Sequence, residues 1–344
     1  MSDVTRTGIQ QASPAGEAVG AGRPGPRAFR RQASRHGGET PVVGEAEFRS
    51  YYGLPIINKP VWRAGNIAGY LFLGGLAGAS SVVAAGAQAT GRPALARAAK
   101  VGSTAAIGLS GAALVHDLGR PARALNMLRV LKPTSPMSLG SWLLAGFSSC
   151  SVAASTSAVT GRWPKLGKAG TIGAATLGSG VATYTAALIS NTAVPVWHEG
   201  YRDMPFTFAA SAASAAAGWG MLSAPIQETS SMRRLGIAAG LAELGASEVM
   251  KRRMGIAAEA YRESPQARRY EQAARVATGV GIAIAATAGR RSRTASVAAG
   301  AALLTGSAMM RFAIFEAGMA SAENPRYTVV PQRRRLAQRA QSEG

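Results

Sequence analysis

The sequence predicts an all-α integral membrane protein with about eight transmembrane helices. Four windows contain no Asp, Glu, Lys or Arg, and each exceeds the stretch of about 20 apolar residues that crosses a bilayer core. These windows are residues 64–91, 133–161, 169–198 and 204–227. They are rich in Ala, Gly and Ser, and much of the net charge of +21 lies in the loops and tails around them. Four spans follow directly from this pattern.

Four further windows complete the prediction. Residues 101–116 follow a basic loop and form a fifth span. Three weaker windows lie at 235–250, 274–289 and 294–316. The charged residues that interrupt this region are Glu243, Glu248 and Arg311. Glu248 is close in sequence to Lys251, so we expect an ion pair at the end of its helix.

The small residues of these windows favour close contact between helices. In lipid there is little hydrophobic drive between helices, so residues such as those of Gly74–Gly78 let backbones approach and gain dispersion contacts. The alternative is a soluble, Ala-rich helical repeat. Soluble surface helices need a polar face, and these windows have none. The low mean hydropathy of +0.07 therefore reflects small residues rather than a soluble fold.

Composition divides the chain into three parts. We expect a disordered basic tail over residues 1–47, a polytopic membrane domain over 48–325 and a basic tail over 326–344. The excess positive charge then lies at the membrane surface, where anionic lipid attracts it. The sequence contains no nucleic-acid-binding module, so we expect no polynucleotide partner.

The inventory of metal ligands is small. Cys150 is the single cysteine, so the chain cannot hold an iron–sulfur cluster by itself or form an internal disulfide. The three histidines are His36, His116 and His198, and they offer no pair of axial haem ligands within the bundle. We expect no resident haem, iron–sulfur cluster or metal ion. Any redox role must then use a diffusible, lipid-soluble carrier.

Several motifs between the helices occur in a characteristic order. They are Tyr51–Pro55, Trp62–Gly75, His116–Pro121, Asn126–Arg129, Ser135–Trp142, Tyr184 with Asn191–Trp197, and Asn324–Arg333. With these motifs, the chain closely resembles the NrfD/polysulfide reductase membrane-subunit family over residues 48–335.

The resemblance implies a quinone-binding membrane anchor of a bacterial inner-membrane oxidoreductase. Such a subunit passes electrons between the menaquinone pool and a four-cluster ferredoxin-like iron–sulfur subunit. That partner in turn serves a molybdopterin-type catalytic subunit. The resemblance also implies that the quinone lies in an N-terminal four-helix bundle, and that this chain is not catalytic alone.

The number of spans, without reference to the family, predicts which polar residues lie on the same side of the membrane. With eight spans, the start of the first helix and the ends of the second and fourth lie on one side of the membrane, together with residues 251–272 and the C-terminus. Asn66 and Tyr70 are four residues apart and share one helix face. The candidate quinone-binding residues on this side are Asn66, Tyr70, His116, Asp117, Arg120, Tyr184, Asn191, Trp197 and His198.

Quinone chemistry requires hydrogen-bond donors to two oxygens and a titratable group. His116, Asp117 and Tyr184 are the candidate catalytic residues, because a tyrosine or histidine donates and a partly buried carboxyl group exchanges protons. Two structural alternatives stay open. Asp117 and Arg120 can form an ion pair that fixes the loop, with Pro121 starting the next helix. The tyrosines can belong to an interfacial aromatic belt.

Glu243 lies deep in a predicted span and is a candidate for a proton route, because acidic residues within a membrane usually face a cavity or a partner. Two rivals to the quinone reading follow: a structural anchor without quinone chemistry, and a proton- or solute-conducting protein. The short loops opposite the candidate site are almost purely basic. The positive-inside rule therefore predicts an extracytoplasmic quinone side; the basic tails and the basic 251–272 loop argue against that orientation.

Overall fold

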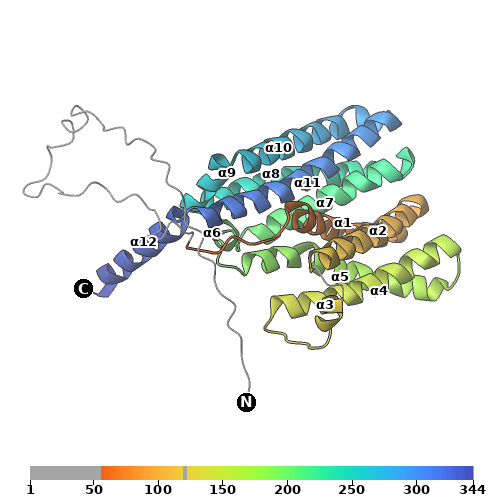
Figure 1. Cartoon of the computed structure of the whole chain (residues 1–344). Helices are drawn as coiled ribbons and strands as arrows, with labels where there is room; N and C mark the ends of the chain where they lie inside the picture. Colours follow the sequence, from red (N-terminus) through yellow and green to blue (C-terminus); the bar gives the residue numbers. More distant parts are fainter. Residues whose placement is uncertain (1–55, 119–121, 344) are drawn as a thin grey trace, which may run out of the picture. The chain divides into compact units, whose positions relative to one another are not determined.

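The computed structural model describes residues 56–118 and 122–343, and all regular secondary structure in these residues is helical (Figure 1). Three predictions lie outside the described residues: the tail at 1–47, the motif at 51–55 and Arg120.

The first four long helices form a four-helix bundle. They are α1 (Ala64–Ala89), α2 (Pro93–Asp117), α4 (Pro136–Thr160) and α5 (Pro164–Ser190). Around this bundle, α1 packs against α2 and α5, and α4 packs against α2 and α5. The short helix α3 (Ala122–Asn126) lies between α2 and α4 in the chain. This is the N-terminal bundle that the family resemblance implies.

The last four long helices repeat the same arrangement. They are α7 (Met204–Ser223), α8 (Ser230–Arg253), α10 (Pro265–Ala286) and α11 (Arg293–Glu323). Here α7 packs against α8 and α11, and α10 packs against α8 and α11. The two bundles meet mainly where α1 packs against α7 and α11. The connecting elements are α6 (Pro195–Glu199), α9 (Ala260–Glu263), α12 (Arg326–Glu343) and the 3-10 turns η1 (Ile226–Glu228), η2 (Gly255–Glu259) and η3 (Ala288–Arg290).

Local sequence signals set many helix boundaries. The helices α2, α4, α5 and α10 each begin at a proline, whose missing N–H costs nothing in the first turn. The side chains of Ser135, Ser264 and Ser292 accept hydrogen bonds from the third amide of the helix that follows each of them. Gly161 ends α4 in the left-handed conformation at φ 71°.

Each predicted window corresponds to one of the eight long helices, but several boundaries are wrong. The helix α2 begins at Pro93, before the window at 101–116, and α10 begins at Pro265, before the window at 274–289. The window at 169–198 is not a single helix, because α5 starts earlier, at Pro164, and ends at Ser190. The residue before a proline is disfavoured in the α region, and Val194 before Pro195 is extended at ψ 119°. Trp197 and His198 therefore belong to the separate helix α6.

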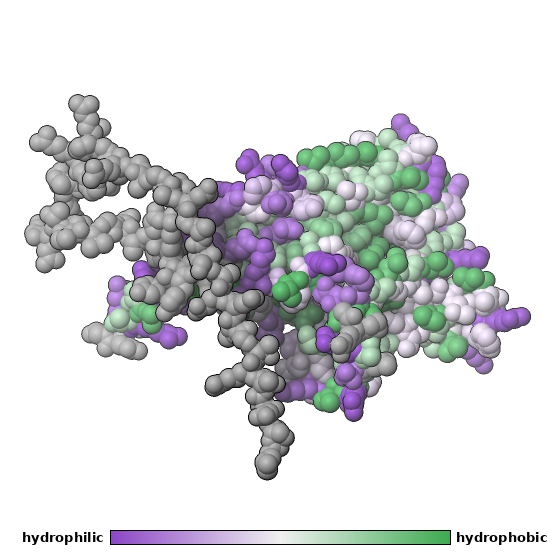
Figure 2. All heavy atoms as spheres, viewed as in Figure 1, coloured by the Kyte–Doolittle hydropathy of each residue, from purple (hydrophilic) through white to green (hydrophobic). Residues whose placement is uncertain are grey.

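Five of the long helices are long and apolar enough to cross a membrane: α1, α2, α4, α5 and α11. The helices α7, α8 and α10 are of comparable length but are not among these five, and α8 and α10 carry several charged residues. Figure 2 shows hydrophobic and weakly polar residues along the helices, with hydrophilic residues concentrated toward both ends. The chain is an all-α membrane protein.

Glycine lets the backbones approach at an equivalent place in each bundle. In the first, a Cβ on Gly78 of α1 would lie 2.4 Å from the carbonyl oxygen of Gly178 on α5. In the second, a Cβ on Gly218 of α7 would lie 2.6 Å from the carbonyl oxygen of Gly300 on α11. Real side chains do not fit at such distances, so each crossing requires glycine. The predicted role of the small residues is confirmed here.

One end of the bundles gathers α3, α6, α9 and α12, and we call it the α6 end (Figure 1). Ion pairs tie its connections together. Arg253 lies 2.8 Å from Asp203, Arg335 lies 3.2 Å from Glu199, and Arg326 lies 3.0 Å from Glu259. Lys59, just before α1, pairs with Glu323 at the end of α11. The predicted grouping of these connections on one side is confirmed.

Candidate functional site

Three polar side chains meet where α1 begins and α2 ends. The amide nitrogen Nδ2 of Asn66 donates to Oδ1 of Asp117 at 3.2 Å and lies 3.2 Å from Nδ1 of His116. Asn66 and Asp117 are half-buried, whereas His116 is exposed. The three therefore form a hydrogen-bonded group that is open to water at the α6 end.

Two tyrosines lie deeper in the same bundle. The ring of Tyr184 packs directly on the backbone of α4, since a Cβ on Gly140 would lie 1.8 Å from its hydroxyl oxygen. Tyr70 lies one helical turn below Asn66 on α1, and it interacts electrostatically with Tyr184 and Asp117. The Ser110 hydroxyl on α2 donates to the carbonyl oxygen of Tyr70 at 3.1 Å and fixes this part of the α1–α2 contact.

Neither tyrosine hydroxyl hydrogen-bonds to another of the described residues, although both side chains are half-buried. We call Asn66, Tyr70, His116, Asp117 and Tyr184 the first-bundle cluster. It combines two unengaged phenol donors with an amide donor and a carboxyl group that reaches water. Such a set can bind a polar acceptor within the bundle and exchange a proton with the surface.

Trp197 has a different environment from the cluster. Its indole Nε1 donates to the carbonyl oxygen of Ile314 at 2.9 Å; its ring stacks on Trp62 and contacts the tilted ring of Phe315. Trp197 is fully buried and packs on Gly318 of α11. In this position, it links α6 to the second bundle rather than lining the cluster.

Asn191 and His198 are also apart from the cluster. Asn191 caps the end of α5 and is exposed, and its backbone N–H bonds to the carbonyl oxygen of Ala187. The ring of His198 is exposed and stacks on Tyr201 at 6.2 Å between ring centroids. The structure thus brings five of the nine candidate residues together and leaves these two and Trp197 outside; the ninth, Arg120, is not described.

The second bundle holds two buried charged residues that lack direct partners. Glu243 on α8 is fully buried, and neither of its carboxyl oxygens has a hydrogen-bond partner among the described residues. Arg311 on α11 is 1% exposed; its Nη2 donates to the carbonyl oxygen of Phe208 at 3.0 Å and its guanidinium stacks over the Phe208 ring at 3.7 Å. Its Nε and Nη1 atoms have no partner in the part of the chain that the structure describes.

The charges of Glu243 and Arg311 are close enough to interact but do not form a salt bridge. Glu243 and Arg311 interact electrostatically, but no direct ion pair joins them in the described structure. The Ser211 hydroxyl is close to Glu243, yet its hydrogen bond here is to the Ser307 hydroxyl at 2.8 Å. Sequence reasoning selected Glu243 but treated Arg311 as an interruption and missed the serine pair. An arginine inside an apolar window was the available signal.

Glu248 forms the ion pair expected at the helix end. It lies 3.3 Å from Lys251 and 3.3 Å from Arg252, and Arg275 of α10 joins the same carboxylate at 3.0 Å.

Comparisons with known proteins give one result. A family model described as polysulphide reductase, NrfD, matches residues 56–246, which is more than half of the chain. No curated protein matches the chain. The matched range contains the whole first bundle, α7 and most of α8, and it includes every member of the first-bundle cluster and Glu243.

Proposed function

This chain belongs to the polysulphide reductase NrfD family, and from that premise we propose that it exchanges electrons with a membrane quinone. Family membership makes it a membrane subunit of a redox complex. We assign the quinone to the menaquinone pool and the electron partner to a four-cluster ferredoxin-like iron–sulfur subunit. That partner would serve a molybdopterin-type catalytic subunit, so this chain acts only as part of the complex.

The two unengaged tyrosine hydroxyls are the main support for a quinone site. Neither hydroxyl has an acceptor among the described residues, and a bound carbonyl oxygen would supply one. Tyr184 approaches from α5 and Tyr70 from α1, and both belong to the bundle to which the resemblance assigns the quinone. The donor set suits a ligand that has two oxygen acceptors.

Each residue of the cluster has a role in this proposal. A bound quinone supplies two carbonyl oxygens, each of which takes up an electron and a proton during reduction. Tyr184 and Tyr70 donate hydrogen bonds toward these oxygens. Asn66 holds the Asp117 carboxyl group in place, while Asp117 and His116 exchange protons with water at the α6 end.

The iron–sulfur partner is assigned to the α6 end, where the cluster opens. The segment after α2 exposes Arg123 and Arg129, and basic side chains of this kind suit an acidic docking face. The short connections at the opposite end contain Arg92, Arg162, Arg234 and Arg290, among other basic residues. By the positive-inside rule, we place that opposite end in the bacterial cytoplasm and the α6 end outside the inner membrane.

A second candidate function is proton transfer through the second bundle. Glu243 favours it, because a fully buried carboxyl group without a hydrogen-bond partner is costly to keep in a membrane unless it has a task. Glu243→Gln in the intact complex tests this. If the complex moves protons by this route, the variant should keep quinone turnover and lose proton release in proteoliposomes.

The quinone proposal is tested with Tyr184→Phe and Asp117→Asn in the intact complex. The first removes one hydroxyl and keeps the ring; the second keeps the size and removes proton exchange. Tyr184→Phe should lower the rate with a menaquinol analogue by about 10- to 100-fold, because a hydrogen bond to a developing charge contributes about 1.5–3 kcal/mol. Asp117→Asn should lower turnover more than it weakens quinone binding.

Two controls separate chemistry from assembly. Tyr270 packs its ring on Phe312, and its hydroxyl has no hydrogen bond within the described part of the chain, so Tyr270→Phe should leave the rate unchanged. An artificial dye that delivers electrons directly to the iron–sulfur partner should react equally well with every variant. Full menaquinol activity in both cluster variants would show that the site is elsewhere. Loss of dye-linked activity and assembly would favour the structural-anchor reading.

A further inference from the structure

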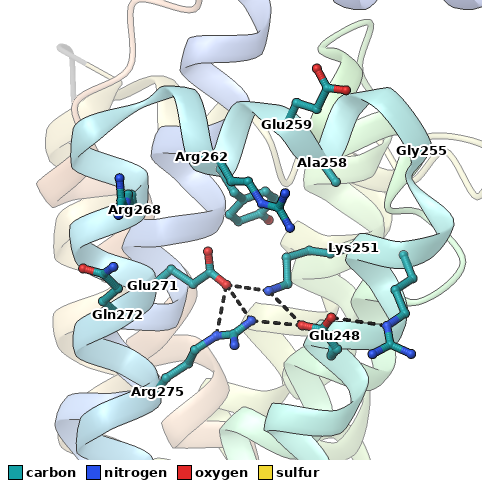
Figure 3. A pocket seen from close by; sticks show the side chains of 12 residues that line it. Glu248, Lys251, Gly255, Ala258, Glu259, Arg262, Arg268, Glu271, Gln272 and Arg275 are labelled. Carbon is teal, nitrogen blue, oxygen red and sulfur yellow. Dashed lines mark hydrogen bonds and ion pairs between the residues drawn. The ribbon is translucent and has the colours of Figure 1, made fainter.

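A hollow opens at the α6 end of the second bundle, away from the first-bundle cluster. It has a volume of about 760 Å³ and lies where α8 ends, α9 turns and α10 begins (Figure 3). Charged side chains dominate its walls: Glu248, Lys251, Arg252, Glu259, Arg262, Arg268, Glu271 and Arg275. We call it the α8–α10 pocket.

The acidic residues of the pocket are already neutralised. Lys251 bridges Glu248 at 3.3 Å and Glu271 at 2.5 Å. Arg275 bridges the same two carboxylates at 3.0 Å and 2.9 Å, as the dashed lines of Figure 3 show. Glu259 pairs with Arg326, which is not among the residues that line the pocket.

The basic residues are in excess. Arg262 and Arg268 line the pocket and have no acidic partner among the described residues (Figure 3). Their guanidinium groups offer planar pairs of N–H donors, which match the oxygens of a phosphate group. The pocket therefore carries a net positive charge that an anion would balance.

A buried donor also belongs to this pocket. Tyr261 lines it but is only 2% exposed, and its hydroxyl has no hydrogen-bond partner in the described structure. Burial, and then the charge of Glu271, raise the pKa of Tyr261, so the hydroxyl keeps its proton. The hydroxyl itself is not open to the pocket, so the arginines supply the donors that a ligand meets first.

Apolar surface continues from the pocket along the outer faces of α8 and α10. Leu241 lies seven residues before Glu248 on the same face of α8, and it is 56% exposed. Val276 lies four residues after Gln272 on α10, and it is 65% exposed. A charged hollow at the helix ends thus leads into exposed apolar helix faces below it.

We propose that the α8–α10 pocket binds the phosphate headgroup of an anionic phospholipid, whose acyl chains lie along Leu241 and Val276. The arginines recognise the phosphate, and the apolar faces favour a lipid over a free anion. An acidic segment of a protein partner would match the charge but would leave these apolar faces uncovered. This proposal does not depend on the quinone site, which lies in the other bundle.

Native mass spectrometry of the full chain in detergent, supplied with phosphatidylglycerol or phosphatidylcholine, tests the proposal. We expect one tightly held phosphatidylglycerol. The double variant Arg262→Gln with Arg268→Gln should weaken its retention by about 30-fold, because each basic residue near anionic lipid contributes about fivefold. Arg290→Gln with Arg291→Gln, at the opposite end of the same bundle, is the matched control and should change nothing.

Further measurements distinguish an anionic phospholipid from the other possible occupants of the pocket. Equal retention of phosphatidylcholine, or an equal effect of the control variant, would overturn the proposal. Binding of inorganic phosphate with the same arginine dependence but without lipid would make the pocket a free-anion site. Loss of a copurifying protein partner with unchanged lipid retention would assign it to docking. The pair Arg262→Lys and Arg268→Lys keeps the charge and should retain more lipid than the glutamine pair, which excludes misfolding as the cause.

Discussion

The two four-helix bundles share one architecture but treat their polar groups in opposite ways. Each has the same pattern of neighbouring helices and one glycine-to-glycine crossing, Gly78 with Gly178 and Gly218 with Gly300. In the first bundle, polar side chains lie near the α6 end, are partly exposed and form hydrogen bonds. In the second, Glu243 and Arg311 are buried within the helices and keep unpaired atoms.

The two bundles differ in how their polar groups reach water. A half-exposed cluster gains partners from water and ligands at little cost, so it suits reversible binding. A buried charge is costly when it is unpaired, and burial of two charges is rarely repaid by their attraction alone. The common scaffold therefore depends on small residues at the helix crossings, while the polar residues of the two bundles differ in burial and pairing.

The largest expected effect concerns the shared crossing. Gly178→Val and Gly300→Val should both prevent stable folding, because each added side chain meets a backbone carbonyl oxygen of the facing helix within 2.7 Å. We expect a loss of about 3 kcal/mol or more, at the upper end of overpacking effects. Expression and size-exclusion chromatography of the tagged chain measure this.

Matched controls exist in both bundles. Gly69 on α1 and Gly279 on α10 have no neighbouring atom within 4 Å of an added Cβ, so valine should be tolerated at either position. If only one of the two crossing variants fails to fold, the two crossings are not equivalent, and the bundles do not share this packing feature.

The next largest expected effect concerns Glu243 and Arg311, the two buried charged residues of the second bundle. Arg311→Met should destabilise the protein by about 3–5 kcal/mol, because it leaves Glu243 buried without a countercharge. The double variant Glu243→Gln with Arg311→Met should recover part of that loss. Thermal unfolding of the wild type, Glu243→Gln, Arg311→Met and the double variant in the same detergent gives the coupling between the residues.

An exposed pair supplies the reference for this cycle. Lys59 pairs with Glu323 near the surface, and its replacement by methionine should cost less than about 1 kcal/mol. If Arg311→Met costs no more than Lys59→Met, then Glu243 is already neutral or hydrated, and the contrast between the bundles is weaker than proposed.

The variant with the smallest expected change in stability tests the role of Tyr184 in the first-bundle cluster. Gly140→Ala places a Cβ where the Tyr184 hydroxyl now lies, so the ring must turn away. Alanine suits a helix better than glycine, so stability should change by less than about 1 kcal/mol. The menaquinol-linked rate of the intact complex should fall by about tenfold through loss of the hydrogen bond from Tyr184.

Gly108→Ala on α2 is the control, since no atom lies within 4 Å of its added Cβ. It should leave both stability and rate unchanged. An unchanged rate in Gly140→Ala, with the ring shown to have moved, would remove Tyr184 from the quinone proposal.

The sequence alone determined the class of the protein and most of its helices. Charge-free windows predict membrane helices because burying a charge in lipid costs free energy at any position along a span. The positions of the charges along the sequence are therefore sufficient to locate the spans. The same reasoning explains the small residues at the crossings. It set several boundaries wrongly. Charged residues hid the starts of α2 and α10, and hydropathy does not register the break before Pro195.

Only the tertiary structure decided which polar residues meet. Asn66 reaches Asp117 across 51 positions of sequence, and Trp197 bonds to Ile314 across 117. These contacts depend on how far each helix is rotated and offset against its neighbour. A shift of one residue turns a side chain by about 100°, from a shared cleft to a packed interface or to lipid. For this reason, Trp197 was predicted beside the cluster and instead lies against α11, and the role of Arg311 became visible only once α7, α8 and α11 were packed together.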